Sequence, residues 1–123
     1  MCERRIFGNQ GEMIAVDYLR EKGWKILDLQ YRTHFGEIDI VAQEKEEIVF
    51  IEVKTRQSID CGYPEESVTP HKLRRLASLG EMYLEERRLE TKPFRLDVIS
   101  VLFKDNGLSE IYHIEAVDMD GNS

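Results

Sequence analysis

The stretch GEIDIVAQEKEEIVFIEVKTR, residues 36–56, constrains this chain more than any other. EIDIVAQ and EIVFIEVKT have the composition of two apolar strands, and EKEE between them is typical of a hairpin tip. Asp39 lies inside the first strand, and Glu52 and Lys54 lie inside the second. A charge within an apolar strand is costly to desolvate unless it is paired, hydrated or bound to an ion. The three charges are therefore expected to serve one another or a ligand.

Strand periodicity places two of these charges on one face. Alternate residues of a strand share a face, so Glu52 and Lys54 point the same way as Phe50. If EKEE forms the loop, Asp39 lies opposite Glu52. Two carboxylates at that separation repel each other unless a proton or a cation lies between them. The hairpin therefore predicts a cation site beside a lysine.

The chemistry of such a set is that of metal-assisted phosphodiester hydrolysis. Carboxylate oxygens suit hard cations such as Mg²⁺ or Mn²⁺. Lys54 can stabilise charge that develops on a phosphate, or orient an attacking water. The simpler alternative is a surface hairpin in which Glu37, opposite Lys54 in the same register, forms a cross-strand ion pair with it.

The rest of the chain predicts a mixed sheet with helices packed on it. The expected elements, in order, are helix 8–22, strand 24–32, the hairpin of residues 36–56, helix 68–89, strand 94–103 and strand 108–117. Gly23 can cap the first helix at its C-terminus. Thr69 and Pro70 suit the start of the second, where Val68 can pack on Leu73. The order α-β-β-β-α-β-β indicates an α/β or α+β sandwich.

Length and composition favour one globular domain over residues 1–123. Apolar residues make up 41% and charged residues 33%, which excludes a disordered chain. The net charge of −7 argues against a general nucleic-acid coat protein. Residues 105–123, an acidic C-terminal strand and tail, carry five of the acids and no Lys or Arg. The remaining chain is close to neutral, which leaves room for a local cationic face.

The cysteines and the N-terminus favour a cytoplasmic protein. Cys2 and Cys61 have no Cys or His at metal-ligand spacing, and a disulfide framework is not expected. MCERRIFGNQGE is too polar for a signal peptide. No apolar run reaches the length of a membrane span, so no membrane partner is expected.

The D-x₁₂-E-x-K run of Asp39, Glu52 and Lys54 resembles the active-site signature of the PD-(D/E)XK nuclease superfamily. That superfamily has the restriction-endonuclease-like fold, with an α-β-β-β-α-β core. Four segments resemble more closely the YraN-type family of uncharacterised bacterial proteins, which is related to Holliday-junction resolvases. They are GNQGEMIAVDYLREKGWKIL, YRTHFGEIDIVA, IVFIEVKTR and YPEESVTPHKLRRLASLGEMYL, and FRLDVIS also fits. One departure is DLQ before YRT, where the family usually has an Asn next to the Tyr.

The resemblance implies a role for each matching residue. Asp39 and Glu52 match metal-binding carboxylates, and Lys54 matches the catalytic lysine. Glu12 matches an acid that resolvase-like members bring to the same site, although an acid there also suits the helix dipole. Lys72 lies where the second helix often carries a Lys or Gln near the site. The implied cofactor is Mg²⁺ or Mn²⁺, and the implied partner is DNA, branched DNA included. The resemblance also allows a homodimer.

Several charged residues remain outside this set. Arg32 and Arg56 flank the open end of the hairpin, where they could touch phosphates. Asp97 is a further charge inside a strand, without an assigned role. Arginines and glutamates alternate along the second helix, which is typical of a solvated face: Arg74, Arg75, Arg87 and Arg88 with Glu81, Glu85 and Glu86. The histidines share no motif and are expected in loops or on the surface: His34, His71 and His113.

Three functions remain open from the sequence. The first is a metal-dependent DNA endonuclease or junction-processing enzyme. The second is a non-catalytic nucleic-acid-binding module that retains the nuclease fold. The third is a protein-interaction domain, which the acidic surface and tail favour.

Overall fold

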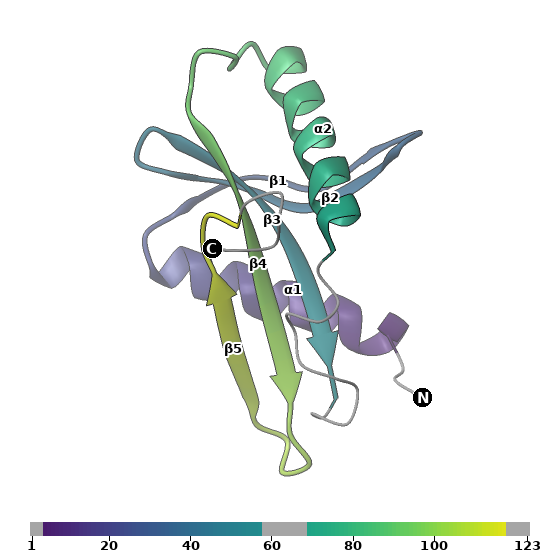
Figure 1. The fold of residues 1–123 in the computed structure, drawn as a ribbon. Coiled ribbons are helices and arrows are strands. Elements are labelled where there is room, and N and C mark those ends of the chain that lie inside the picture. The colour runs from purple at the N-terminus through teal and green to yellow at the C-terminus, as the bar shows by residue number, and fades with distance from the viewer. Residues whose placement is uncertain (1–3, 58–68, 118–123) are drawn as a thin grey trace.

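A five-stranded sheet lies between two helices in the computed structural model of this chain (Figure 1). The structure describes residues 4–57 and 69–117, with side chains from residue 10 onward. The elements are α1 (Arg4–Glu21), β1 (Lys25–Thr33), β2 (Gly36–Glu44), β3 (Glu47–Arg56), α2 (Pro70–Glu86), β4 (Phe94–Phe103) and β5 (Ser109–Ile114). Within these residues neither helix has a stretch long and apolar enough to cross a membrane.

The sheet is mixed, and its strands lie in chain order from β1 to β5. The neighbouring strands β3 and β4 are parallel, and the other neighbours are antiparallel. Parallel neighbours need a crossover, and the connection from β3 to β4 contains α2. The predicted fold class, an α-β-β-β-α-β core with a mixed sheet and flanking helices, is confirmed, with β5 added at the edge.

Each face of the sheet has its own hydrophobic core, because alternate residues of β3 point to opposite sides. Phe50 packs with the buried stripe of α2 on one face. Val49 and Ile51 pack with α1 on the other face, around Leu19. Each of these side chains is fully buried, which contributes roughly 1.5–3 kcal/mol apiece. The two cores fix how each helix lies against β3.

The ends of the helices follow the predicted capping residues. The Thr69 hydroxyl accepts the Lys72 backbone N–H at 3.2 Å, as an N-cap does. Gly23, at φ 87°, follows α1 and confirms the predicted C-cap. The second helix ends at Glu86, earlier than predicted, because Arg88 adopts a left-handed conformation with φ 57°. Val68, the predicted packing partner of Leu73, lies outside the described residues, as do both cysteines.

The tip of the β2–β3 hairpin is tighter than predicted. Glu44 and Glu47 face each other in the ladder, so the turn is Lys45–Glu46 rather than EKEE. Two facing acids would repel each other. Here the Arg95 guanidinium donates to both, at 2.8 Å to Glu44 and 3.0 Å to Glu47. A cation from β4, distant in sequence, therefore allows the strands to pair up to the turn.

Candidate active site

The β2–β3 ladder ends where the charged residues begin. The register runs from Gln43 opposite Ile48 to Ile40 opposite Ile51, which confirms the predicted register over this length. Beyond it, a side-chain oxygen of Asp39 accepts the Val53 backbone N–H at 2.8 Å. A carboxylate thus takes the place of a main-chain acceptor, which holds Asp39 against the β3 backbone.

Glu52 and Lys54 form an ion pair on β3. Their charged atoms are 3.4 Å apart, and their side chains are 26% and 18% exposed. The lysine is therefore held beside the carboxylate at the rim of the core rather than in open solvent.

The predicted Glu37–Lys54 ion pair is wrong. Glu37 faces Arg32 across the β1–β2 ladder and pairs with its guanidinium at 2.9 Å. The position of β1 beside Glu37 gives this carboxylate a closer cation.

Glu12 reaches the sheet from α1 through a close helix–strand contact. A Cβ on Gly11 would overlap the Thr55 hydroxyl, so the absent side chain lets α1 approach β3. The next residue, Glu12, lies beside the side-chain amide of Gln30, with N–O distances of 3.4 and 3.5 Å. Gln30 also accepts from Arg32 at 3.0 Å. The amide therefore connects the site to the surface ion pair of Arg32.

Gln30 is a residue that the sequence signalled only as a departure from the family pattern. Its backbone has φ 51°, a left-handed conformation that Asn adopts more readily than Gln. Tyr31 packs on the α2 side of the sheet, whereas Leu29 lines a groove with α1 residues. The backbone at Gln30 thus redirects the strand and turns the amide toward Glu12.

Burial and the neighbouring carboxylates raise the pKa of Asp39. Burial is the main cause, and the negative charges of Glu12, Glu52 and Glu37 add to it, against the opposing hydrogen bond from Val53. Together they raise the pKa of Asp39 to about 7. Burial also raises the pKa of Glu12. Without a cation, Asp39 therefore stays protonated up to about pH 7.

The donors of this group fit a hard divalent cation. Asp39, Glu52 and Glu12 offer carboxylate oxygens only, the ligands that Mg²⁺ and Mn²⁺ prefer. A divalent cation there would offset the mutual repulsion that raises the pKa of Asp39.

The three predicted phosphate-contacting residues differ in accessibility. The Arg32 side chain is 70% exposed and is held by Glu37. Arg56 is only 5% exposed, so little of its surface is available to a ligand. Lys72 is half-buried in the first turn of α2. Contact of any of them with nucleic acid stays a prediction.

A second cluster of ionisable groups lies on β4 and β5. Ligand atoms of Asp97, His113 and Glu115 all lie within 4.8 Å of one another, which makes them a candidate metal-binding group. In the parts of the chain that the structure describes, the ligand atoms of Asp97, His113 and Glu115 meet this distance limit. Those of Glu12, Asp39 and Glu52 do not. Sequence reasoning missed this group because its members come from separate strands.

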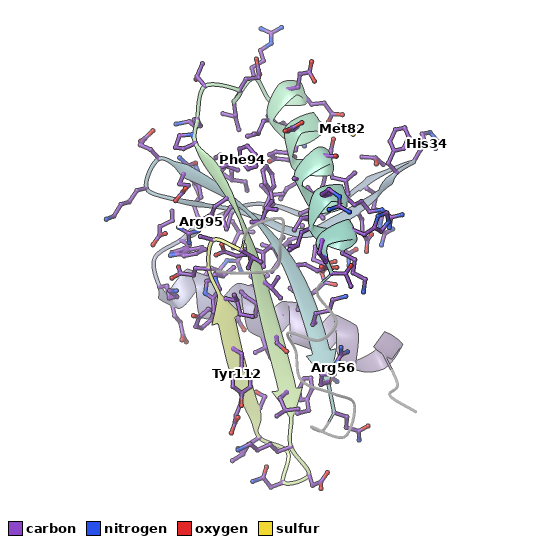
Figure 2. All side chains as sticks on the ribbon, in the orientation of Figure 1. His34, Arg56, Met82, Phe94, Arg95 and Tyr112 are labelled. Carbon is purple, nitrogen blue, oxygen red and sulfur yellow. The ribbon has the colours of Figure 1, made fainter. Side chains whose placement is uncertain are left out.

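The Asp97 carboxylate in this cluster already has several donors. Arg95 donates to it at 3.0 and 3.3 Å, and the Ala116 backbone N–H at 3.0 Å. His113 Nε2 lies 2.7 Å from it, with the His113 side chain 5% exposed, so the predicted loop or surface position of His113 is wrong. Arg95, labelled in Figure 2, thus brings a fixed positive charge to the position a cation would need. Burial by itself would raise the pKa of Asp97, but these hydrogen bonds lower it overall.

The fold and the Asp39 site together define an α/β protein with a nuclease-like core and an acidic cluster on its central strands. Comparison with known proteins identifies the family of this chain. The profile of the uncharacterised protein family UPF0102 matches residues 11–101, and the chain belongs to this family, as the YraN-type resemblance predicted. The resemblance to the PD-(D/E)XK superfamily is consistent with this membership.

Relatives match over nearly their whole length. A UPF0102 protein of Syntrophotalea carbinolica is 45% identical over 120 residues, covering 97% of each chain. One from Geotalea uraniireducens is 40% identical over 114 residues, covering 93% of this chain and 90% of the relative. One from Syntrophomonas wolfei is 44% identical over 110 residues, covering 89% and 95% respectively. None of these names states an activity.

Proposed function

We propose that this chain is a metal-dependent endonuclease that hydrolyses phosphodiester bonds in DNA, branched DNA included. One observation carries the proposal. Burial, together with the charges of Glu12 on α1 and Glu52 on β3, raises the pKa of Asp39 on β2, and Lys54 is paired to Glu52. A structural ion pair needs one acid for one base, whereas this site has excess acid. The excess is what a divalent cation neutralises.

Each side chain has a distinct task in the proposed reaction. Asp39 and Glu52 hold Mg²⁺ or Mn²⁺, with Glu12 as a further carboxylate. The cation supplies Lewis-acid polarisation of the phosphate when it is bound. Lys54, fixed by Glu52 at 3.4 Å, orients the attacking water and stabilises the negative charge that develops on the phosphate oxygens.

Cleavage assays test this proposal. Purified chain is incubated with branched, single-stranded and duplex DNA in Mg²⁺ or Mn²⁺, and with EDTA as the metal-free control. Lys54→Ala is expected to lower the cleavage rate by about 10²–10³-fold, because it removes a charge that acts in the transition state. Lys104→Ala is the matched control, since Lys104 also pairs with a glutamate, Glu110, but lies in the β4–β5 turn.

The outcomes separate three cases. Metal-dependent cleavage that is lost in Lys54→Ala and kept in Lys104→Ala supports the endonuclease. Equal cleavage by wild type and Lys54→Ala points to a contaminating nuclease and contradicts the proposal. DNA binding without metal-dependent cleavage would favour the non-catalytic binding module instead.

A further inference from the structure

A groove of about 710 Å³ lies between the β1–β2 turn and α2. The turn contributes His34 and Phe35, and α2 contributes the remaining lining residues: His71, Arg74, Arg75, Ser78, Leu79 and Met82. We call this surface the turn–α2 groove. Figure 2 shows His34 where the β1–β2 hairpin projects beside α2, with Met82, which also lines the groove, on the helix. The groove lies on a different surface from the Asp97 cluster of β4 and β5.

The charge of the turn–α2 groove is opposite to that of the whole chain. The chain has a net charge of −7, yet among the residues that the structure describes the lining contains two arginines, two histidines and no carboxylate. Arg74 and Arg75 are exposed, and neither forms an ion pair with any residue in the described ranges. The glutamates of the second helix therefore do not pair with Arg74 and Arg75. A cationic groove whose arginines have no acidic partner among the described residues, on an acidic protein, fits a polyanion.

The turn holds an aromatic ring in solvent. Phe35 is 69% exposed, although a phenyl ring is usually buried. The turn that carries it is fixed, because the Thr33 hydroxyl accepts the Phe35 backbone N–H at 2.9 Å and donates to the Gly36 carbonyl at 3.3 Å. Gly36 also lies against α2, since a Cβ there would be 3.5 Å from the Arg75 side chain. An exposed ring on a hydrogen-bonded turn, in the same groove as two arginines, is suited to stack on a nucleobase.

The groove is connected to the candidate active site by β2. From Gly36, at the groove, to Asp39 the strand advances three residues, roughly 10 Å. The groove and the Asp39 backbone are therefore neighbours along β2, at a distance that a few nucleotides can span.

We propose that the turn–α2 groove binds a single-stranded segment of nucleic acid, with Phe35 stacked on an unpaired base and Arg74 and Arg75 at the phosphates. Bases within a duplex are stacked on each other and offer no free face to a protruding ring. This inference rests on the proposed nuclease function and narrows its substrate to DNA with an unpaired segment beside the scissile bond.

Fluorescence anisotropy tests the groove without cleavage. Full-length chain is titrated in EDTA against a labelled single-stranded oligonucleotide and against the matching duplex. Phe35→Ala is expected to weaken single-strand binding about tenfold and leave duplex binding unchanged. Arg74→Gln with Arg75→Gln is expected to weaken binding and to lower the slope of log K against log salt by about 1.4.

The control variants remove an exposed apolar side chain, or two positive charges, at positions away from the groove. Leu108→Ala removes an apolar side chain that is 64% exposed in the β4–β5 turn. Arg88→Gln with Lys104→Gln removes two positive charges away from the groove. Both controls are expected to bind the single strand as wild type does.

The inference is overturned if wild type does not bind the single strand, or if the control pair weakens binding as much as the Arg74 and Arg75 pair. Equal weakening of single-strand and duplex binding by Phe35→Ala would also overturn it. Unchanged binding by Phe35→Ala alongside Lys54-dependent cleavage would reject the groove and keep the nuclease. Single-strand binding that depends on Phe35, without any cleavage, would support the groove and reject the nuclease.

Discussion

Asp39 and Asp97 are both aspartates inside strands of one sheet, yet their surroundings are opposite. Asp97 is fully buried and accepts hydrogen bonds from Arg95 and the Ala116 backbone, with His113 beside it. Asp39 has the Val53 backbone N–H and the charges of other carboxylates around it. The pKa of Asp97 is lowered and that of Asp39 is raised. The first acid is neutralised by partners within the chain, and the second is the one that we propose as a cation ligand.

The largest expected effect is on stability when Asp97 is replaced. Asp97→Asn leaves the Arg95 guanidinium, 15% exposed, without its buried counter-charge, and should lower the free energy of unfolding by about 3 kcal/mol at pH 7. Because the pKa of Asp97 is lowered in the folded chain, its stabilisation is present above the ordinary pKa and is lost as the pH falls through the folded value. Urea denaturation from pH 7 downward measures both effects.

The control for this change is Glu110→Gln, which removes an exposed carboxylate paired with Lys104. Its expected cost is small, because exposed ion pairs contribute little to stability. A similarly small loss of stability in Asp97→Asn would show that Arg95 and His113 find other partners. It would contradict the inferred difference between Asp97 and Asp39.

A smaller effect of opposite sign is expected when Asp39 is replaced. Asparagine keeps an oxygen for the Val53 N–H and removes the charge. The folded pKa of about 7 exceeds the ordinary 3.8, so the stabilisation from protonated Asp39 is complete below about pH 3.8 and is lost as the pH rises through 7. The full shift corresponds to roughly 4 kcal/mol, and burial of the polar asparagine offsets part of it, so Asp39→Asn should be more stable than wild type by about 2 kcal/mol at pH 8 without divalent cations.

Denaturation of both proteins in urea across pH 4–8 checks this prediction. The advantage of Asp39→Asn should shrink toward the acidic end. Asp17→Asn, an exposed acid on α1, should change stability by less than about 0.5 kcal/mol throughout. A wild type that gains stability between pH 4 and pH 8 relative to Asp39→Asn would contradict the raised pKa.

Local patterns predicted the parts of the molecule that local physics determines. Period two and the hairpin composition gave the register near Gln43 and Ile48, and the Thr69 cap located the start of α2. The same periodicity placed Glu52 and Lys54 on one face. These features depend on residues close in sequence, so the sequence alone was sufficient for them.

Partners that come from distant strands could not be predicted in this way. Glu37 pairs with Arg32 because β1 lies beside it, in a register shifted by an irregularity between Ile26 and Asp28. Arg95 joins carboxylates from three other segments, which no spacing in the sequence reveals: Glu44, Glu47 and Glu115. The cluster of Asp97, His113 and Glu115 was missed for this reason. The acids around Asp39 were visible because most of them lie in one hairpin.

The smallest expected effect, cation binding, decides which cluster takes a metal. At about ten times its dissociation constant, Mg²⁺ or Mn²⁺ should raise the free energy of unfolding of wild type by about 1.4 kcal/mol. Asp97→Asn should gain as much, because Arg95 already supplies the positive charge of that cluster. Asp39→Asn should gain little, since it lacks the central carboxylate. NaCl at matched ionic strength separates specific binding from screening. Retained stabilisation in Asp39→Asn, with loss in Asp97→Asn, would instead place the cation among Asp97, His113 and Glu115.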